Sequence, residues 1–208
     1  MMQMHKGLRQ DNLSWSVLTQ IEEGPMDANS VAAVFGKLDF EIFVLTAAHQ
    51  DRCSGQIVCW VVPATIVPQV PRLLVGIGRT TFTRELIEKS QRFALNLLGK
   101  DQWPLVTHFG FRSGRDVDKF ATLPFERGVT GSPILSGTVG YLECEVRDVL
   151  DAGAHLFYLA DVIEGKIVAD RTPLCLHHLP DVLPQEDFAT MRRLLERDAQ
   201  CNLGLLKK

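Results

Sequence analysis

The chain has 208 residues, of which 46% are apolar and 23% charged, a composition typical of one globular domain that folds without disulfides or metal. Its formal net charge of −3, without a long run of lysine or arginine, argues against nucleic acid or an anionic membrane as the main partner. No apolar run approaches the roughly 18 residues of a membrane-spanning helix, and the N-terminus lacks the apolar segment of a secretory signal. We therefore expect a cytoplasmic protein that binds neither nucleic acid nor membrane.

Residues 1–26 end in the turn sequence Glu-Glu-Gly-Pro, which separates a predicted N-terminal arm from a predicted domain over residues 27–180. At the start of that domain, Asp27 or Asn29 can cap a short helix that runs to Phe35 and stops near Gly36. A strand rich in Phe, Ile and Val is predicted to follow over residues 39–47.

The stretch from residue 54 to residue 98 alternates short strands with one helix. Residues 56–62 run almost without a polar side chain, which predicts a strand buried on both faces. Pro63, Pro68 and Pro71 each lack a backbone donor, so the segment that they span is predicted to be a loop or an edge. The other predicted strands of this stretch are residues 73–77 and 93–98.

A helix is predicted over residues 81–90, because hydroxyl residues that cap helices precede an apolar periodic segment. The unpaired N–H groups and the positive dipole end of a helix start attract anions. Together with the cation of Arg79, the hydroxyls of Thr81 and Thr83 would allow this helix start to hold a phosphate. An ordinary capped helix without a ligand fits the same residues, because Ser and Thr caps are common.

The second half of the chain returns to a strand pattern after a short helix over residues 102–109 and a polar surface excursion over 113–131 with one helical turn. One long strand from Leu135 to Val149 is predicted, and then a meander of two further strands separated by a tight turn at Glu164 and Gly165. Many strands with few short helices favour a closed antiparallel barrel over a parallel sheet.

The segment 181–208 is predicted to form a separate C-terminal helix and tail. Within it, residues 185–201 carry an apolar stripe of Phe188, Met191, Leu194 and Leu195 between charged residues. A helix of this length gains its stability by packing such a stripe against another surface. We expect it to pack on the barrel or across a dimer.

The cysteines and histidines do not predict a metal centre. The five cysteines, an odd number without a C-x-x-C pair, suggest neither a disulfide framework nor a zinc site, and we expect most of them to be buried thiols. His108 and the pair His177 and His178 have no cysteine or carboxylate at ligand spacing beside them. No metal site is therefore expected.

Several motifs in order resemble the flavin reductase-like domain family, whose fold is the FMN-binding split barrel. The closest likeness is to the C-terminal reductase domain of flavodiiron proteins. The similarity covers roughly residues 30–178. Its motifs are residues 38–46, Trp60 with the proline-flanked loop to Pro71, the Thr-rich helix with 93–98, His108-Phe109, 131–135, 141–144, 153–155 and 162–166.

The resemblance implies a homodimer of six-stranded antiparallel Greek-key barrels, mainly β with short flanking helices, that binds FMN near the dimer interface. Reduced nicotinamide, NADH or NADPH, would transfer a hydride to the flavin. The resemblance assigns the FMN phosphate to Arg79, Thr81 and Thr83. It assigns the isoalloxazine ring to the segment that begins at Ile57, with Ile57, Val58, Cys59, Trp60, Ala64 and Thr65 as candidate contacts.

The sequence departs from the family pattern around the tryptophan. Relatives usually carry small polar residues there, whereas this chain has Cys59, Val62, Pro63 and Val67 and keeps Thr65. The loss of several side-chain hydrogen bonds, at about 1 kcal/mol each, would lower flavin affinity by two or more orders of magnitude. Either flavin binding is weak, or backbone groups make the contacts.

His155 is the candidate catalytic residue, because the resemblance places it near the flavin and the nicotinamide. The family motif Gly-Asp-His here reads Gly153, Ala154 and His155, so no adjacent carboxylate orients the imidazole. A purely structural histidine is the alternative. Two functions therefore remain: an NAD(P)H-dependent flavin reductase, or a dimeric split-barrel binding or scaffold protein with a degraded flavin site.

Overall fold

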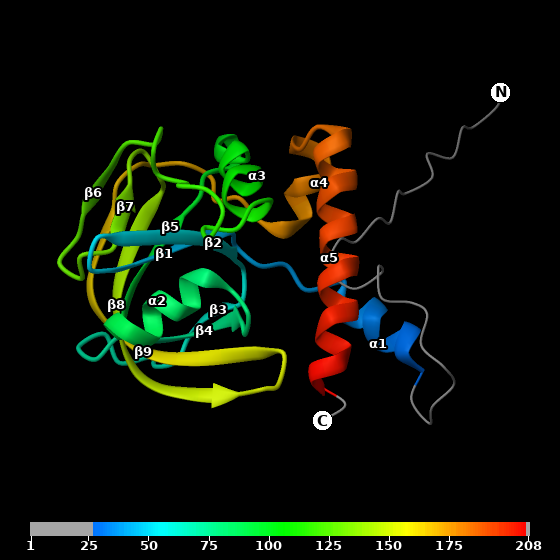
Figure 1. Ribbon diagram of the computed structural model, residues 1–208, viewed down its shortest axis with the longest axis horizontal. Helices are drawn as coiled ribbons and strands as arrows, with labels where there is room; N and C mark the ends of the chain where they lie inside the picture. Colours follow the sequence, from blue (N-terminus) through cyan, green and yellow to red (C-terminus); the bar gives the residue numbers. More distant parts are fainter. Residues whose placement is uncertain (1–26, 207–208) are drawn as a thin grey trace.

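The computed structural model describes residues 27–206, in which a strongly curved antiparallel sheet forms the body and most helices lie on one side of it (Figure 1). The predicted arm over residues 1–26 and the last two residues lie outside the described chain. The strands are β1 (Phe43–His49), β2 (Arg52–Val58), β3 (Val61–Pro63), β4 (Arg72–Gly78), β5 (Arg92–Leu97), β6 (Phe125–Arg127), β7 (Pro133–Leu135), β8 (Gly140–Asp151) and β9 (His155–Ile167).

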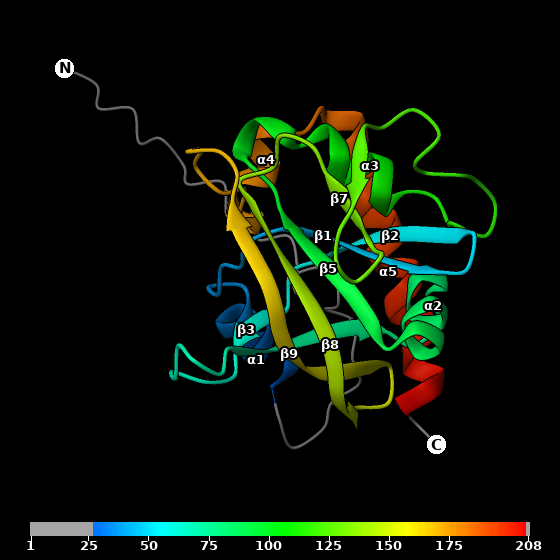
Figure 2. The ribbon, with the colours of Figure 1, turned by 90° about the vertical axis from the view of Figure 1, so that its left-hand side faces the viewer.

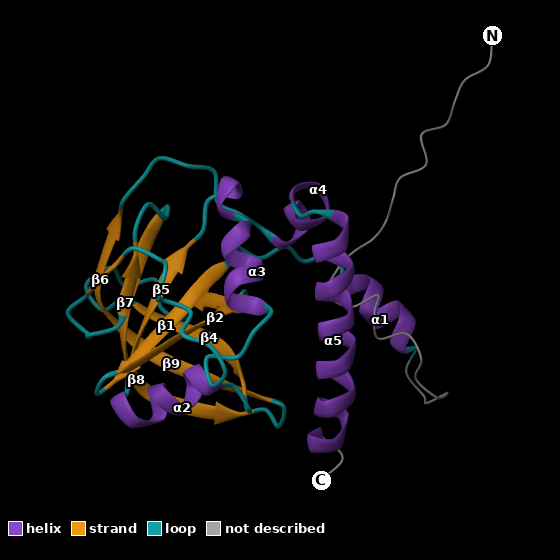
Figure 3. Ribbon diagram, turned by 45° about the horizontal axis from the view of Figure 1, so that its top comes forward, coloured by secondary structure: helices purple, strands orange, loops and turns teal. Residues whose placement is uncertain are grey.

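The helices flank this sheet (Figure 3). They confirm the predicted helices to within a few residues, and the C-terminal helix runs to Leu206, beyond its predicted end at residue 201. The α-helices are α1 (Ala28–Phe35), α2 (Phe82–Ser90), α3 (Pro104–Gly110), α4 (Leu179–Val182) and α5 (Gln185–Leu206), with short 3-10 turns at η2 (Lys100–Gln102) and η3 (Leu176–His178).

The main sheet has the order β2-β1-β5-β8-β9-β4-β3, with every pair antiparallel (Figure 2). Its two edge strands, β2 and β3, are consecutive in the chain and are separated only by Cys59 and Trp60. One kinked segment therefore pairs with β1 at one end of the sheet and with β4 at the other. When β2 and β3 are counted as one strand, the predicted six-stranded barrel is confirmed.

Two predictions about this strand were wrong. The predicted strand over 56–62 is broken at Cys59 and Trp60, because its two halves pair with different partners. It is also not buried on both faces: Val58 lies in the core, but Val62 is 45% exposed. An apolar run alone does not show that one part of a segment leaves the core.

Three further predictions in the second half were also wrong. The excursion over 113–131 contains turns and β6 but no helix. The predicted strand from Leu135 to Val149 is interrupted by a turn, where Gly137 has φ +73. There is no turn at Gly165, which pairs with Leu142 inside β9; a Cβ on Gly165 would lie 3.2 Å from the Tyr141 carbonyl oxygen, so this glycine permits close strand approach.

Two apolar clusters stabilise the barrel from opposite faces of the sheet. Successive residues of β1 divide between them, because side chains alternate along a strand: Leu45 belongs to the interior cluster and Val44 to the outer one. Phe188 and Met191 of α5 pack against the outer cluster. The expected packing of the C-terminal helix is confirmed for these two residues, whereas Leu195 is exposed.

A buried carboxylate fixes the loop between β6 and β7. Glu143 on β8 is almost fully buried and accepts hydrogen bonds from Val129 N at 3.0 Å, Thr130 N at 2.8 Å and Thr130 Oγ1 at 2.6 Å. A Cβ on Gly128 would lie 2.3 Å from the carboxylate oxygens, so only glycine fits there. Charge-assisted bonds of this kind hold an otherwise polar surface loop against the sheet.

Lys119 is a second buried charge, 5% exposed, on the excursion that precedes β6. Its ammonium group donates to the Gly55 carbonyl at 2.9 Å and to the Phe109 carbonyl at 2.7 Å. Burial lowers the pKa of Lys119 from 10.5 to about 8. The lysine thereby ties the excursion to β2 and α3.

The free energy of unfolding should rise with pH between about 8 and about 10.5 because of Lys119. Its pKa is lower in the folded chain than in the unfolded chain, so the unfolded chain binds more protons in this window. Urea denaturation of wild type and Lys119→Met across this range should show a difference in pH slope, at most about 3 kcal/mol in total. Lys89→Met, at an exposed helix position, is the control; equal slopes for wild type and Lys119→Met would contradict the assignment.

Candidate functional site

The break between β2 and β3 places backbone groups beside an aromatic side chain. The Trp60 carbonyl accepts a hydrogen bond from Gly76 N at 2.9 Å, which fixes the second half of the kink to β4. The N–H groups of Cys59 and Trp60 form no hydrogen bond with any other residue of the described chain. Two donors are thus available next to the half-buried Trp60 ring.

Trp60, His155 and Phe157 form one aromatic cluster. The ring centroids of Trp60 and His155 are 4.7 Å apart, and the planes of Trp60 and Phe157 lie within 9° of parallel at 6.1 Å. Gly76 makes this packing possible, because a Cβ there would lie 2.9 Å from Phe157 Cε1 and 3.0 Å from Trp60 Cε3. Stacked rings of this kind present a flat, apolar surface.

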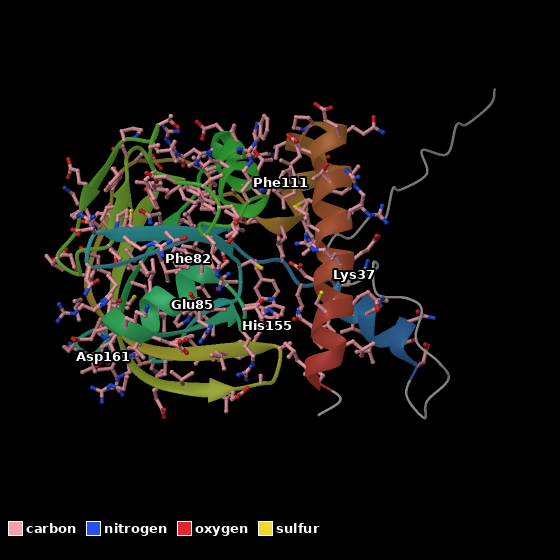
Figure 4. All side chains as sticks on the ribbon, in the orientation of Figure 1. Lys37, Phe82, Glu85, Phe111, His155 and Asp161 are labelled. Atoms are coloured by element: carbon pink, nitrogen blue, oxygen red, sulfur yellow. The ribbon has the colours of Figure 1, made fainter. Side chains whose placement is uncertain are left out.

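His155 begins β9 and lies at the end of the barrel nearest α5 (Figure 4). It pairs with Gly78 at the end of β4, which brings the predicted catalytic residue beside the predicted phosphate residues. Burial lowers the pKa of His155, so its imidazole is neutral at pH 7. The side chain can position a ligand ring without adding a positive charge.

Cys59 lies in the kink but is not a reactive thiol. Burial raises the pKa of Cys59 from 9.0 to about 11. The thiolate, which is the nucleophilic form, is therefore scarce at neutral pH. Cys59 can contribute shape and its backbone N–H to a ligand, not covalent chemistry.

The start of α2 follows directly from β4. Arg79 N donates to the Ala154 carbonyl at 3.0 Å, so the last residue pair of the β4 and β9 ladder leads into the helix. The expectation of a hydroxyl cap was wrong: Thr81 occupies the N-cap position without capping, and its hydroxyl donates to the Gly78 carbonyl at 3.1 Å. The helix start itself therefore keeps unpaired N–H groups.

Arg79 is held by the hairpin between β8 and β9. Its Nε donates to the Gly153 carbonyl at 2.5 Å, and its Nη2 forms an ion pair with the Asp151 carboxylate. Asp151 also accepts from Gly153 N at 2.8 Å, so the same carboxylate stabilises the turn. The Arg79 ion pair and the Gly153 backbone hydrogen bond lower the pKa of Asp151.

Several residues predicted to bind the flavin do not face the aromatic cluster or the start of α2. Thr83 is 2% exposed and donates to Ser54 Oγ at 3.0 Å, so its hydroxyl faces β2. Val58 points into the barrel, and Ile57 packs against the outer cluster. Ala64 N donates to the Arg72 carbonyl at 2.8 Å, and Thr65 Oγ1 accepts from Val67 N at 3.1 Å.

An apolar pocket of about 220 Å³ opens beside Trp60 and Phe157. Val62 of β3 and Leu74 of β4 belong to its lining, and the loop that connects these two strands exposes apolar side chains, with Ile66 99% exposed. The pocket is lined by Phe35, Leu38, Phe40, Trp60, Val62, Leu74 and Phe157.

No group of three or more His, Cys, Asp or Glu side chains within residues 27–206 is arranged to hold a metal ion. In the same part of the chain, no helix is both long and apolar enough to cross a bilayer.

A family model described as flavin reductase like domain matches residues 35–180. The chain belongs to this family. A curated relative, the high molecular weight rubredoxin of Moorella thermoacetica, is 31% identical over 139 residues, which are 66% of this chain and 60% of the relative. Diflavin flavoproteins of Nostoc and Synechocystis also match, and the chain spans only about a quarter of their length.

Two solved structures show the same fold. The NADH:FAD oxidoreductase of Streptomyces globisporus superposes with a TM-score of 0.65 at 23% identity, covering 75% of this chain and 92% of that chain. An FMN-binding protein of Thermus thermophilus with bound p-hydroxybenzaldehyde superposes with a TM-score of 0.61 at 26% identity, covering 72% and 81%. The predicted split barrel and flavin reductase-like family are therefore confirmed.

Sequence reasoning missed three residues of the candidate site: Gly76 and Phe157, which pack with Trp60, and Asp151, which pairs with Arg79. Gly76 had a local signal, because a glycine inside an apolar strand often marks close approach of another group. Phe157 lies opposite Gly76 in the ladder, a register that the sequence does not reveal. Asp151 meets Arg79 across 72 positions of the chain, for which no local pattern exists.

Replacing Gly76 by Ala should force the Trp60 and Phe157 rings apart and destabilise the fold by about 1–3 kcal/mol, the usual cost of overpacking. Urea denaturation followed by tryptophan emission measures both effects. Gly78→Ala is the matched control, because a methyl group there meets only Thr81 Cγ2, at 3.3 Å. Equal stability of the two variants would show that the rings do not depend on Gly76.

Proposed function

We propose that this protein is an NAD(P)H-dependent flavin reductase that binds FMN at the kink between β2 and β3. The supporting observation is the pair of unbonded N–H groups of Cys59 and Trp60 beside the stacked Trp60 and Phe157 rings. Flavins need this combination, since their tricyclic ring is flat and its pyrimidine edge carries hydrogen-bond acceptors. Family membership agrees with it.

The residues present fit a flavin, with backbone groups in place of the polar side chains that the sequence lacks. The N–H groups at the kink would bind the pyrimidine edge, and Thr81 with the start of α2 would face the phosphate. Pro63 offers no donor, and the Thr65 hydroxyl already accepts from Val67 N. The chain therefore depends on two backbone donors, and we expect moderate affinity.

A bound flavin would supply the two-electron chemistry, in which a hydride would pass from the reduced nicotinamide to the flavin and water would provide the accompanying proton. The protein contributes position more than acid or base groups. Neutral His155, packed against Trp60, would orient the nicotinamide without repelling its oxidised, positively charged form. The aromatic cluster would also exclude water from one face of the site.

The nicotinamide, the choice of FMN and the cytoplasmic location are parts of this proposal. Support for a nicotinamide comes from the Streptomyces globisporus oxidoreductase, solved with NAD and FAD fragments, and support for FMN from the Thermus thermophilus FMN-binding protein. Five free cysteines are typical of a reducing compartment.

We also infer that two copies form a homodimer through the apolar pocket, which Trp60 and Val62 help to line. Phe35 and Leu38 also line this pocket, and the loop that connects β3 to β4 exposes the apolar residues Ile66, Val67 and Val70. Such a region on one chain is typical of a protein interface. Sedimentation at micromolar concentration should give twice the chain mass; a monomer mass would contradict this inference.

A non-catalytic scaffold is the second candidate function, and one observation favours it: Asp151 neutralises Arg79, the only cation predicted to bind the phosphate.

If the protein is a reductase, protein purified with FMN should be yellow with one flavin per chain, and the colour should bleach on addition of NADH. A colourless protein that does not change on addition of FMN or riboflavin would support the scaffold instead.

His155→Ala should leave FMN affinity within about twofold of wild type but slow flavin reduction by NADH tenfold or more, because positioning affects rate more than flavin binding. Fluorescence titration gives the affinity and stopped-flow absorbance the rate. His49→Ala, a half-buried histidine at the end of β1, controls for loss of an imidazole. Reduction at the wild-type rate would remove His155 from the catalytic role.

A further inference from the structure

The phosphate end of the proposed site has no free positive charge from Arg79. Two of the five N–H donors of this guanidinium go to the Gly153 carbonyl and to the Asp151 carboxylate. The side chains of Arg79 and Asp151 are 34% and 60% exposed, so solvent and a ligand can reach both. A phosphate at the start of α2 would meet an Arg79 cation and an Asp151 anion together.

The ion pair between Arg79 and Asp151 reduces the ability of the proposed site to distinguish a flavin with a phosphate from one without. A phosphate near a free arginine gains a charge-assisted contact, but a phosphate near a neutral pair gains almost none. The uncharged parts of the proposed site, the Trp60 ring and the N–H groups at the kink, are the same for every flavin. The isoalloxazine would then provide most of the affinity and the phosphate little.

We propose that Asp151 competes with the flavin phosphate for Arg79 and that the chain consequently accepts riboflavin nearly as well as FMN. This inference rests on the proposed flavin site and adds its ligand specificity. Asp151 changes only the charge that the phosphate meets, so it is a specificity-determining residue and not a catalytic one. Arg79 also stabilises the turn that precedes His155, through its hydrogen bond to the Gly153 carbonyl.

Asp151→Asn removes the charge while keeping the turn. The Asn side-chain oxygen can still accept from Gly153 N and from Arg79, the two bonds that Asp151 makes now. Asp148→Asn is the matched control. Asp148 is exposed on the same strand, contacts its own neighbour Val149 N, and forms no ion pair with another residue of the described chain.

The experiment is fluorescence titration of FMN and of riboflavin into wild type, Asp151→Asn and Asp148→Asn at low salt. For wild type, the two dissociation constants should agree within about threefold. Asp151→Asn should bind FMN about tenfold more tightly and leave riboflavin unchanged, since a net charge of one now faces the phosphate. Salt at 0.5 M shortens the Debye length to roughly 4 Å and should reduce that gain.

The outcomes separate the two proposals. If flavins bind but Asp151→Asn leaves the ratio of the FMN and riboflavin constants unchanged, or if Asp148→Asn changes it equally, the role of Asp151 is overturned and the flavin site stands. A wild type that already prefers FMN by a hundredfold overturns it as well. If neither flavin binds to any of the three proteins, the proposed function itself fails.

Discussion

Closure of the barrel depends on the two-residue break between β2 and β3. A six-stranded sheet has two edges, and here a single segment satisfies both: β2 pairs with β1, the chain turns at Cys59 and Trp60, and β3 pairs with β4. The hydrogen bond from Gly76 N to the Trp60 carbonyl secures the turn. Without the break, β2 would continue past the sheet and leave the edge of β4 open to other chains.

The same break creates the candidate site. Residues that leave one ladder before joining the next keep N–H groups without partners, and the Trp60 ring is turned toward His155 and Phe157. The pairing of Gly78 with His155 then places the start of α2 beside the aromatic cluster. The same two-residue break therefore closes the barrel and presents a flat surface for a ligand. Gly76 allows the rings of this surface to pack, and the hairpin at Asp151 holds Arg79 beside it.

Local patterns in the sequence were enough for most elements and for the family, because strand alternation, prolines and helix caps act over a few residues. They failed where the structure of a segment depends on a residue far away in the sequence. The apolar run over 56–62 does not show that its halves pair with different strands, and Arg79 gives no sign of Asp151. One error was avoidable: Phe82, Thr83, Leu86 and Ile87 follow helical spacing and are all buried, so the sequence already placed Thr83 on the inward face of α2.

The central claim is that the N–H groups of Cys59 and Trp60 bind the flavin. NMR of nitrogen-15-labelled protein titrated with FMN observes these two groups directly. The account predicts that their amide resonances, with that of the Trp60 indole, shift most and saturate at one flavin per chain. Saturable FMN binding that leaves these resonances in place would contradict it.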